Sequence, residues 1–300
     1  MSTLLKEFLQ NFNYERTATI PEIVADLNQI VEIDKLSELK KKEYKTKVLY
    51  YFIGLAVSIV LLIVIIFIAI DNSYSALAIP SLIIAIIYFI LTVLYASFMQ
   101  EHFTILNFPY YRYESTKKVL QMLNRDIDNI SEVELQLSFI TILVKENKKY
   151  TIAHPHKSGW KIDHYQDEWL KIKGQFLDKT RFGLTAIELS KNQHGWERVR
   201  SGKTKYKSKT KKLGLDVILT LTYPLKRYGA VKVLQNQAID AIQLPTYCQI
   251  QGLKITHKSI NLAVRISPDM CEANEGIYQS ITMMFLSLYQ VLNLANILSK

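Results

Sequence analysis

Charged residues are scarce in this sequence, at 21% of 300 positions, whereas 49% of the residues are hydrophobic. A disordered or low-complexity chain has the opposite balance, so that class of protein is excluded. Cysteine is rarer still: two residues exclude a small secreted domain held together by disulfides. The chain is long enough for about two domains.

Signatures of catalysis are also missing. The chain has no GxSxG, GxGxxG or protein-kinase motif. The stretch from Ser201 to Thr204 resembles the end of a phosphate-binding loop, but Glu197 stands where that loop needs its first glycine, and the local pattern is a strand. No cofactor is therefore expected, and an enzyme is the least favoured class.

Three histidines form the best candidate for a metal site. His154 and His156 would project to one face of a strand, and His164 lies among carboxylates. Their spacing matches no metalloenzyme signature such as HExxH, and histidines in polar loops are ordinarily solvated. We therefore expect no metal site and keep these residues only as an alternative.

Charges are completely absent from residues 48–70 and 76–98, two runs of 23 residues each. A helix of that length spans roughly 35 Å and can cross a hydrocarbon core of ~30 Å. Only residues 71–75 separate the runs, so the sequence predicts a transmembrane helical hairpin with a short external loop. The lysines before the first run, with none in the loop, predict a two-pass integral membrane protein with both termini cytoplasmic.

The fold class expected from these patterns is an α+β membrane protein. The predicted hairpin is joined to a mostly antiparallel, β-rich cytoplasmic domain over residues 115–300, closed by a long C-terminal helix. Residues 1–47 are predicted to form a cytoplasmic helical segment, and residues 99–114 an aromatic linker. Alternating apolar residues predict six or seven strands. The uncharged heptad pattern from Ile277 to Leu298 predicts a helix packed on the sheet, an oligomerising helix or a membrane-embedded helix.

Positive charge is concentrated in the predicted cytoplasmic domain. The chain has a net charge of +10 although its mean hydropathy is +0.06. Residues 1–47 hold eight basic and eight acidic residues, whereas residues 99–300 hold 29 basic and 18 acidic ones. The charge therefore belongs to one domain and not to the chain as a whole.

Lysines recur at every second position from Lys203 to Lys211. In a strand this spacing places them on one face, ~6.6–6.8 Å apart. A two-residue turn at Ser201 and Gly202 would pair Arg200 with Lys203 and Trp196 with Lys207. The predicted anion-binding face then consists of Trp196, Arg198, Arg200, Lys203, Lys205, Lys207, Lys209 and Lys211. A solvated hairpin whose lysines prevent edge-to-edge aggregation is the alternative.

These expectations favour a membrane-anchored, non-enzymatic binding or scaffold protein. Its basic hairpin would meet an anionic partner, which is a lipid headgroup, a nucleic acid or an acidic protein. The alternative function is an oligomeric channel-like or membrane-disrupting effector, gated by an anionic small ligand such as a nucleotide. Self-association would then use the small residues Gly54 and Ser58 or the helix from Ile277 to Leu298.

Overall fold

The computed structural model describes residues 8, 11–71, 109–198, 202–234 and 238–298, together with 83, 86, 87, 89–91, 93–95, 97 and 98. The chain forms two compact units. One unit comprises Met1–Asn28 with Pro109–Lys300, and the other comprises Gln29–Phe108.

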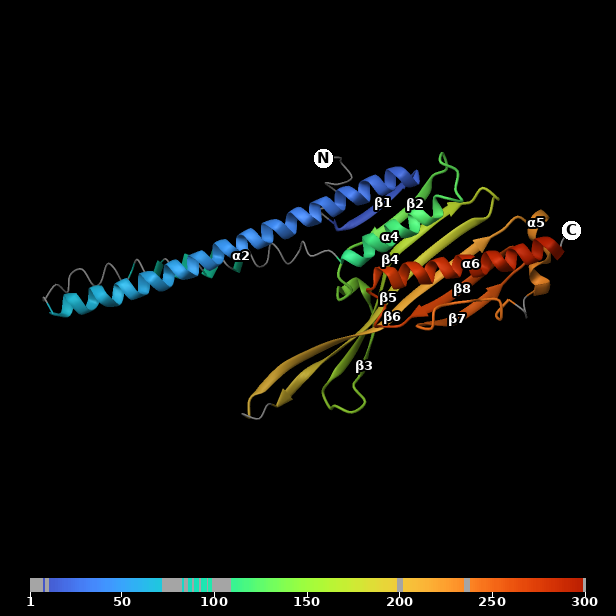
Figure 1. Ribbon diagram of the computed structural model, residues 1–300. Coiled ribbons are helices and arrows are strands. Elements are labelled where there is room, and N and C mark those ends of the chain that lie inside the picture. Colours follow the sequence, from blue (N-terminus) through green and yellow to red (C-terminus); the bar gives the residue numbers. More distant parts are fainter. Residues whose placement is uncertain are drawn as a thin grey trace. The chain divides into compact units, whose positions relative to one another are not determined.

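The first unit is built on an antiparallel sheet of eight strands (Figure 1). The strand order is β1-β2-β4-β5-β6-β8-β7, and β3 pairs with β4 beside this path. The strands are β1 (Asn13–Ala18), β2 (Val133–Ser138), β3 (Lys148–Ala153), β4 (Lys161–Gln175), β5 (Arg181–Arg198), β6 (Thr204–Thr222), β7 (Cys248–Ile255) and β8 (Ser259–Ile266). The expected mostly antiparallel sheet is therefore observed, with β1 contributed by a segment expected to be helical.

One face of this sheet carries the hydrophobic core. Leu184, Leu219 and Leu262 oppose one another across β5, β6 and β8 and are completely buried. The other face is polar, with pairs such as Arg265–Asp216 and Lys173–Glu134. Alternation of apolar and polar residues along each strand produces this two-faced sheet.

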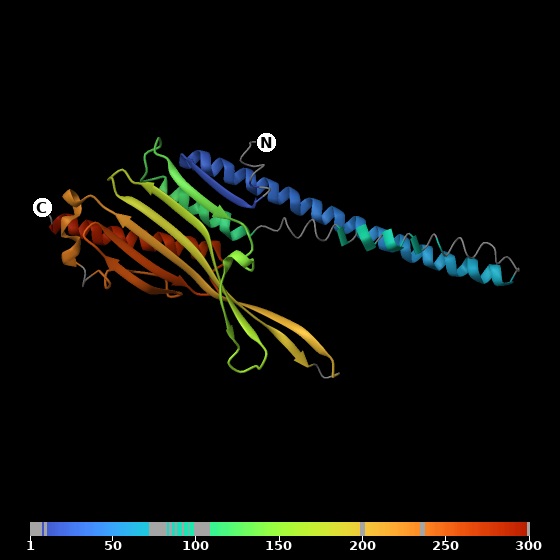
Figure 2. The same ribbon diagram turned by 180° about the vertical axis from the view of Figure 1, so that it is seen from behind.

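Helices cover the apolar face only. α4 (Tyr110–Leu123) and α6 (Asn274–Leu298) lie across that face, while the strands of the polar face stay uncovered in the view from behind (Figures 1 and 2). The short helices η1 (Lys145–Asn147), α5 (Leu225–Tyr228) and η2 (Gly229–Leu234) lie in connections. α4 begins directly after Pro109, so aromatic residues that were expected in a linker belong to its first turn.

The predicted transmembrane hairpin is wrong. Residues 48–70 are the second half of one continuous 52-residue helix, α2 (Ile20–Asp71). Residues 72–82 and several positions between 84 and 98 lie outside the described residues. In the part of the chain that the structure describes, a single helix, α6, is long and apolar enough to cross a membrane.

α6 instead has the buried face of a core helix. Ile277, Ile281, Met284 and Leu288 are completely buried, at the helical spacing that the sequence shows. Glu275 and Asn293 lie on its exposed side. Of the three alternatives for this segment, packing on the sheet is the one that the structure shows.

The second unit contains the rest of α2. Every described apolar side chain from Leu49 to Val64 is exposed, including Leu49 at 58% and Val60 at 60%. The rings of Tyr51 and Tyr95 contact each other edge to face, 5.3 Å apart. Exposed apolar surface of this kind marks a site of contact with another protein or with lipid.

Candidate basic face and its base

The last part of β5 and the first part of β6 extend beyond the helices as a paired arm, and the start of β4 pairs with β5 as far as His194 (Figures 1 and 2). We call residues 190–198 and 204–212 the arm. Lys205, Lys207, Lys209 and Lys211 share one face of the arm and are all exposed. Lys191, directly opposite Lys211, adds a fifth ammonium group. These five lysines are the basic face.

The predicted register of this hairpin is wrong by one residue. Arg198 pairs with Thr204 and Trp196 pairs with Tyr206, so neither Arg198 nor Trp196 shares a face with the lysines. Arg200 lies outside the described residues. Lys203 precedes the start of β6 and is exposed. The structure thus brings together the four lysines from Lys205 onward but not the other members of the predicted set.

The cause is the number of residues between the strands. Five residues, an odd number, separate Arg198 from Thr204, whereas the predicted turn contained two. Gly202 in this connection has φ +79°, a conformation that favours glycine. A bulge at Leu213 restores the register, because Lys212 and Gly214 oppose the adjacent residues Ser190 and Leu189. The lysines consequently continue the uncovered polar face of the sheet.

Gly214 beside this bulge cannot accept a side chain without strain. Its φ is +132°, and a Cβ there would lie 2.6 Å from the backbone oxygen of Ile266. We expect Gly214→Ala to lower the free energy of unfolding by about 1–3 kcal/mol. Gly183→Ala is the matched control, because nothing lies within 4 Å of a Cβ at Gly183. Denaturant titrations followed by tryptophan fluorescence measure both, and equal losses would contradict this account.

A tryptophan that the sequence pattern did not single out lies beneath the basic face. The indole of Trp160 covers Gly195, where a Cβ would meet its Cγ at 2.6 Å. Its Nε1 donates to the backbone oxygen of Trp196 over 3.2 Å, and Lys157 Nζ lies 4.0 Å from its ring centroid. Since Gly195 pairs with Lys207, the ring of Trp160 packs against the strand on the face that carries the lysines, and Lys157 lies over that ring.

Little acidic charge offsets the basic face. Lys207 pairs with Glu197 over 2.8 Å, and the hydrogen bond from Lys207 lowers the pKa of Glu197. Within the described part of the chain, Lys205, Lys209 and Lys211 have no ion pair. Glu197 is also the only acidic residue between positions 191 and 212, against nine basic ones. The face is therefore available to an external anion.

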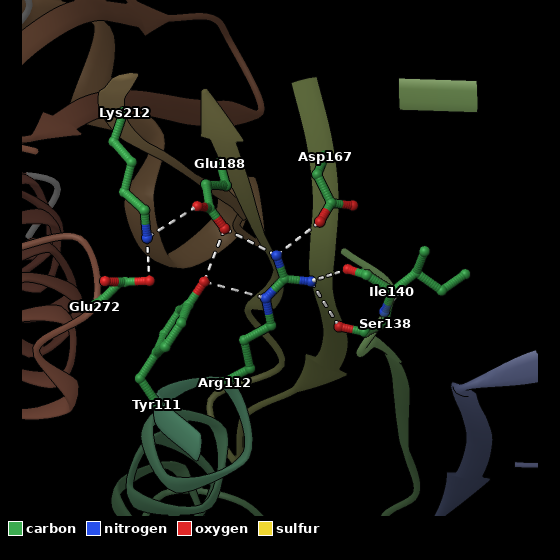
Figure 3. Close-up of polar contacts among 8 residues, drawn as sticks. All are labelled: Tyr111, Arg112, Ser138, Ile140, Asp167, Glu188, Lys212 and Glu272. Atoms are coloured by element: carbon green, nitrogen blue, oxygen red, sulfur yellow. Dashed lines mark hydrogen bonds and ion pairs between the residues drawn. The ribbon is translucent and has the colours of Figure 1, made fainter. Parts of the chain in front are cut away.

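The base of the arm is fixed by a buried arginine (Figure 3). Arg112 Nη2 donates to Asp167 Oδ2 over 2.7 Å and to Glu188 Oε2 over 2.8 Å. Its Nη1 donates to the backbone oxygens of Ser138 and Ile140, and its Nε to the Tyr111 hydroxyl. All five N–H donors of the guanidinium thus have acceptors.

This network joins α4 to β4, through Asp167, and to β5, through Glu188, just before β5 enters the arm. Arg112, Asp167 and Glu188 are 2–4% exposed. Burial raises the pKa of Asp167 even though Arg112 acts against it. Lys212, the last residue of the arm, lies 3.6 Å from Glu188 and also pairs with Glu272 (Figure 3). The network fixes where the arm leaves the sheet.

The opposite face of the arm carries a second polar cluster. Asp163, His194 and Tyr206 form a hydrogen-bonded chain across β4, β5 and β6. Sequence reasoning did not connect these residues with one another, because they are far apart in the chain and the incorrect register separated His194 from Tyr206. The one available signal in the sequence was that Tyr206 stands between Lys205 and Lys207, which places it on the face of the strand opposite the lysines.

The histidines weighed as metal ligands do not come together. His154 and His156 have ring centroids 6.3 Å apart, whereas His164 stacks on Tyr150 at 4.5 Å. Among the residues that the structure describes, no group of three histidine, cysteine or acidic side chains is placed to hold a metal ion.

A hollow of about 610 Å³ lies at the far side of the sheet from the arm's lysines. Its lining includes the rings of Phe176, Tyr228, Phe285 and Tyr289. Asp178 at its edge accepts hydrogen bonds from the Tyr228 hydroxyl and from the backbone and hydroxyl of Thr180. No arm residue lines it, so the two features are separate.

Comparisons of this chain with protein-family models, with curated proteins and with solved structures found no match.

Proposed function

We propose that this protein is a binding or scaffold protein whose basic face contacts an anionic lipid surface. The observation that carries the proposal is the basic face itself, with lysines exposed on one side of a projecting arm. A basic residue close to an anionic leaflet contributes about 1 kcal/mol to binding. Several lysines in one plane suit a surface of headgroups, because all of them contact it at once.

The placement of the aromatic residues favours lipid over single-stranded nucleic acid. Proteins that bind single strands combine cationic groups with aromatic rings in one groove. Here the exposed rings of Trp196 (66%) and Tyr206 (54%) lie on the face opposite the lysines. A flat anionic surface contacts the lysine face without needing these rings.

The apolar half of α2 supports the same proposal. Its described side chains from Leu49 to Val64 are exposed, and residues 48–70 carry no charge. Lipid hydrocarbon is the covering proposed for this stretch, as contact with lipid and not as a hairpin of two spans. A protein held at a bilayer in this way keeps its basic residues near headgroups.

Protection of lysines from acetylation tests the proposal. The full chain is reconstituted into vesicles of phosphatidylcholine, with or without phosphatidylglycerol, and treated briefly with an acetylating reagent. We expect Lys205, Lys207, Lys209 and Lys211 to be protected several-fold in the anionic vesicles at low salt. High salt should remove that protection, since it screens contacts between exposed charges.

Exposed lysines elsewhere are the internal control for this footprint. Lys145, Lys149, Lys254 and Lys258 are exposed and lie outside the arm. Their acetylation should be the same in both kinds of vesicle. Equal reactivity of the arm lysines in neutral and anionic vesicles would refute the lipid contact.

A further inference from the structure

A tyrosine, a histidine and an aspartate are linked in series on the face of the arm opposite the lysines. The Tyr206 hydroxyl lies 2.8 Å from His194 Nδ1, and His194 Nε2 lies 3.0 Å from Asp163 Oδ2. The three residues come from β6, β5 and β4. A nucleophile, a base and a carboxylate that orients the base have this arrangement in nucleophilic catalysis.

The carboxylate is held in place and kept ionised. Asp163 Oδ1 accepts from the Thr151 hydroxyl over 2.6 Å and pairs with Lys148 Nζ over 2.8 Å. Burial alone would raise the pKa of Asp163, but the hydrogen bonds from Lys148, Thr151 and His194 outweigh it and lower the pKa to about 2. In the tautomer that carries its proton on Nε2, His194 donates to the ionised Asp163, which leaves the Nδ1 lone pair facing the Tyr206 hydroxyl.

The tyrosine at the end of this hydrogen-bonded series is accessible to a reactant. Tyr206 is 54% exposed, whereas the side chains of His194 and Asp163 are 19% and 8% exposed. The ring of Trp196 stands 5.5 Å from that of Tyr206 and offers a surface for an aromatic group. Lys161, exposed and directly opposite His194, places a positive charge on the same face.

We propose that Tyr206 is a nucleophile that His194 activates and that accepts a phosphoryl group from phosphate esters with an aromatic leaving group. The oxygen of Tyr206 forms a bond to phosphorus while the bond from phosphorus to the leaving oxygen breaks. His194 Nδ1 takes the phenolic proton and passes it to the leaving oxygen, so the products are a phosphorylated Tyr206 and a phenol. Asp163 is a positioning residue, and Lys161 stabilises the negative charge that develops on the phosphoryl oxygens.

Tyr150 provides an internal comparison for the test. It is also 54% exposed and lies beside a histidine, but its ring stacks on His164 at an angle of 18°. Within the described part of the chain, its hydroxyl has no hydrogen bond to an imidazole. The two tyrosines therefore match in exposure and differ in the contact that the proposal requires.

The full chain is treated with diethyl 4-nitrophenyl phosphate, and phosphorylation is followed by 4-nitrophenolate release and peptide mass spectrometry. A general base contributes about 10²-fold or more to such a step, so Tyr206 should react at least about tenfold faster than Tyr150. His194→Gln should bring the rate at Tyr206 down to that at Tyr150. Asp163→Asn should give a smaller loss, since His194 remains.

Labelling of Tyr150, which lies on β3 and pairs with β4, reports whether this neighbouring part of the sheet is intact in each variant. An unchanged rate at Tyr150, with a slower rate at Tyr206, supports activation by His194. Equal rates at the two tyrosines in the unaltered protein, or an unaffected Tyr206 in His194→Gln, would overturn the proposal. Neither result changes the expected protection of the arm lysines from acetylation. The phosphoryl-transfer proposal and the proposed lipid contact can therefore be refuted independently.

Discussion

Replacing Arg112 with methionine is expected to lower the free energy of unfolding by about 3–5 kcal/mol. The substitution leaves Asp167 and Glu188 buried, at 4% and 3% exposure, without the guanidinium that donates a hydrogen bond to each. It also removes the donors to the backbone oxygens of Ser138 and Ile140. The loss is larger than that of an exposed ion pair because buried carboxylates cannot recover their hydration.

Thermal unfolding of the full chain in neutral detergent, followed by tryptophan fluorescence, measures this loss. A change of about 1 kcal/mol shifts Tm by roughly 2–4 °C in a domain of this size, so Tm should fall by roughly 6–20 °C. Arg265→Met is the matched control. Arg265 also makes a bidentate ion pair, with Asp216 at 2.6 and 2.7 Å, but on the open face of the sheet, and we expect a loss of about 1 kcal/mol or less.

The pH dependence separates buried charge from lost packing. Burial already raises the pKa of Asp167 in the intact network, and removal of Arg112 should raise it further. A carboxyl whose pKa is raised in the folded state binds a proton more readily folded than unfolded, so stability increases as the pH falls. The deficit of Arg112→Met should therefore shrink on acidification, and a deficit independent of pH would show that packing alone is responsible.

Local patterns in the sequence were sufficient to predict several of the strands, although not β1, and did not predict which strands pair. Alternation such as Val133, Leu135 and Leu137 depends only on which face of a strand is buried, and these residues are buried as predicted. The tight turn between β4 and β5 is equally local: it contains Asp178 and Lys179, and Lys179 there has φ +67°. Both features depend on residues adjacent in the chain.

The register of the arm shows why the basic face was predicted only in part. Period-two spacing correctly places the lysines from Lys205 onward on one face. Whether Trp196 joins them depends on whether the connection has an odd or an even number of residues, and one residue reverses the result. The compensating bulge at Leu213 has no sequence signature beyond the adjacent Gly214.

The network around Arg112 could not be predicted because its members are distant in the chain. Arg112 and Glu188 are 76 residues apart in the sequence. Taken alone, an arginine or a glutamate is ordinarily expected on the surface of a protein. Similarly, hydropathy and length described residues 48–70 and 76–98 as equivalent spans. They could not show that the first run continues a helix that starts at Ile20, in the sheet-containing unit.

Replacing Lys205, Lys207, Lys209 and Lys211 together with serine is expected to weaken binding to anionic vesicles by roughly 10²–10³-fold, from about 1 kcal/mol per lysine. Full chain held in nanodiscs of phosphatidylcholine is captured on immobilised vesicles that contain phosphatidylglycerol. The nanodisc covers the apolar stretch of α2, so capture reports the exposed basic residues. Folding should be unharmed, because Lys191 and Lys211 oppose each other and such like-charged pairs destabilise a sheet.

The matched control removes the same charge elsewhere, by serine at Lys145, Lys149, Lys254 and Lys258. If net charge alone governed capture, both variants would lose the same affinity, and the basic face would have no special role. A loss confined to the arm variant locates binding on that face. Added single-stranded oligonucleotide distinguishes the partner: if it binds more tightly than the vesicles and depends on the same lysines, nucleic acid and not lipid is the ligand of the arm.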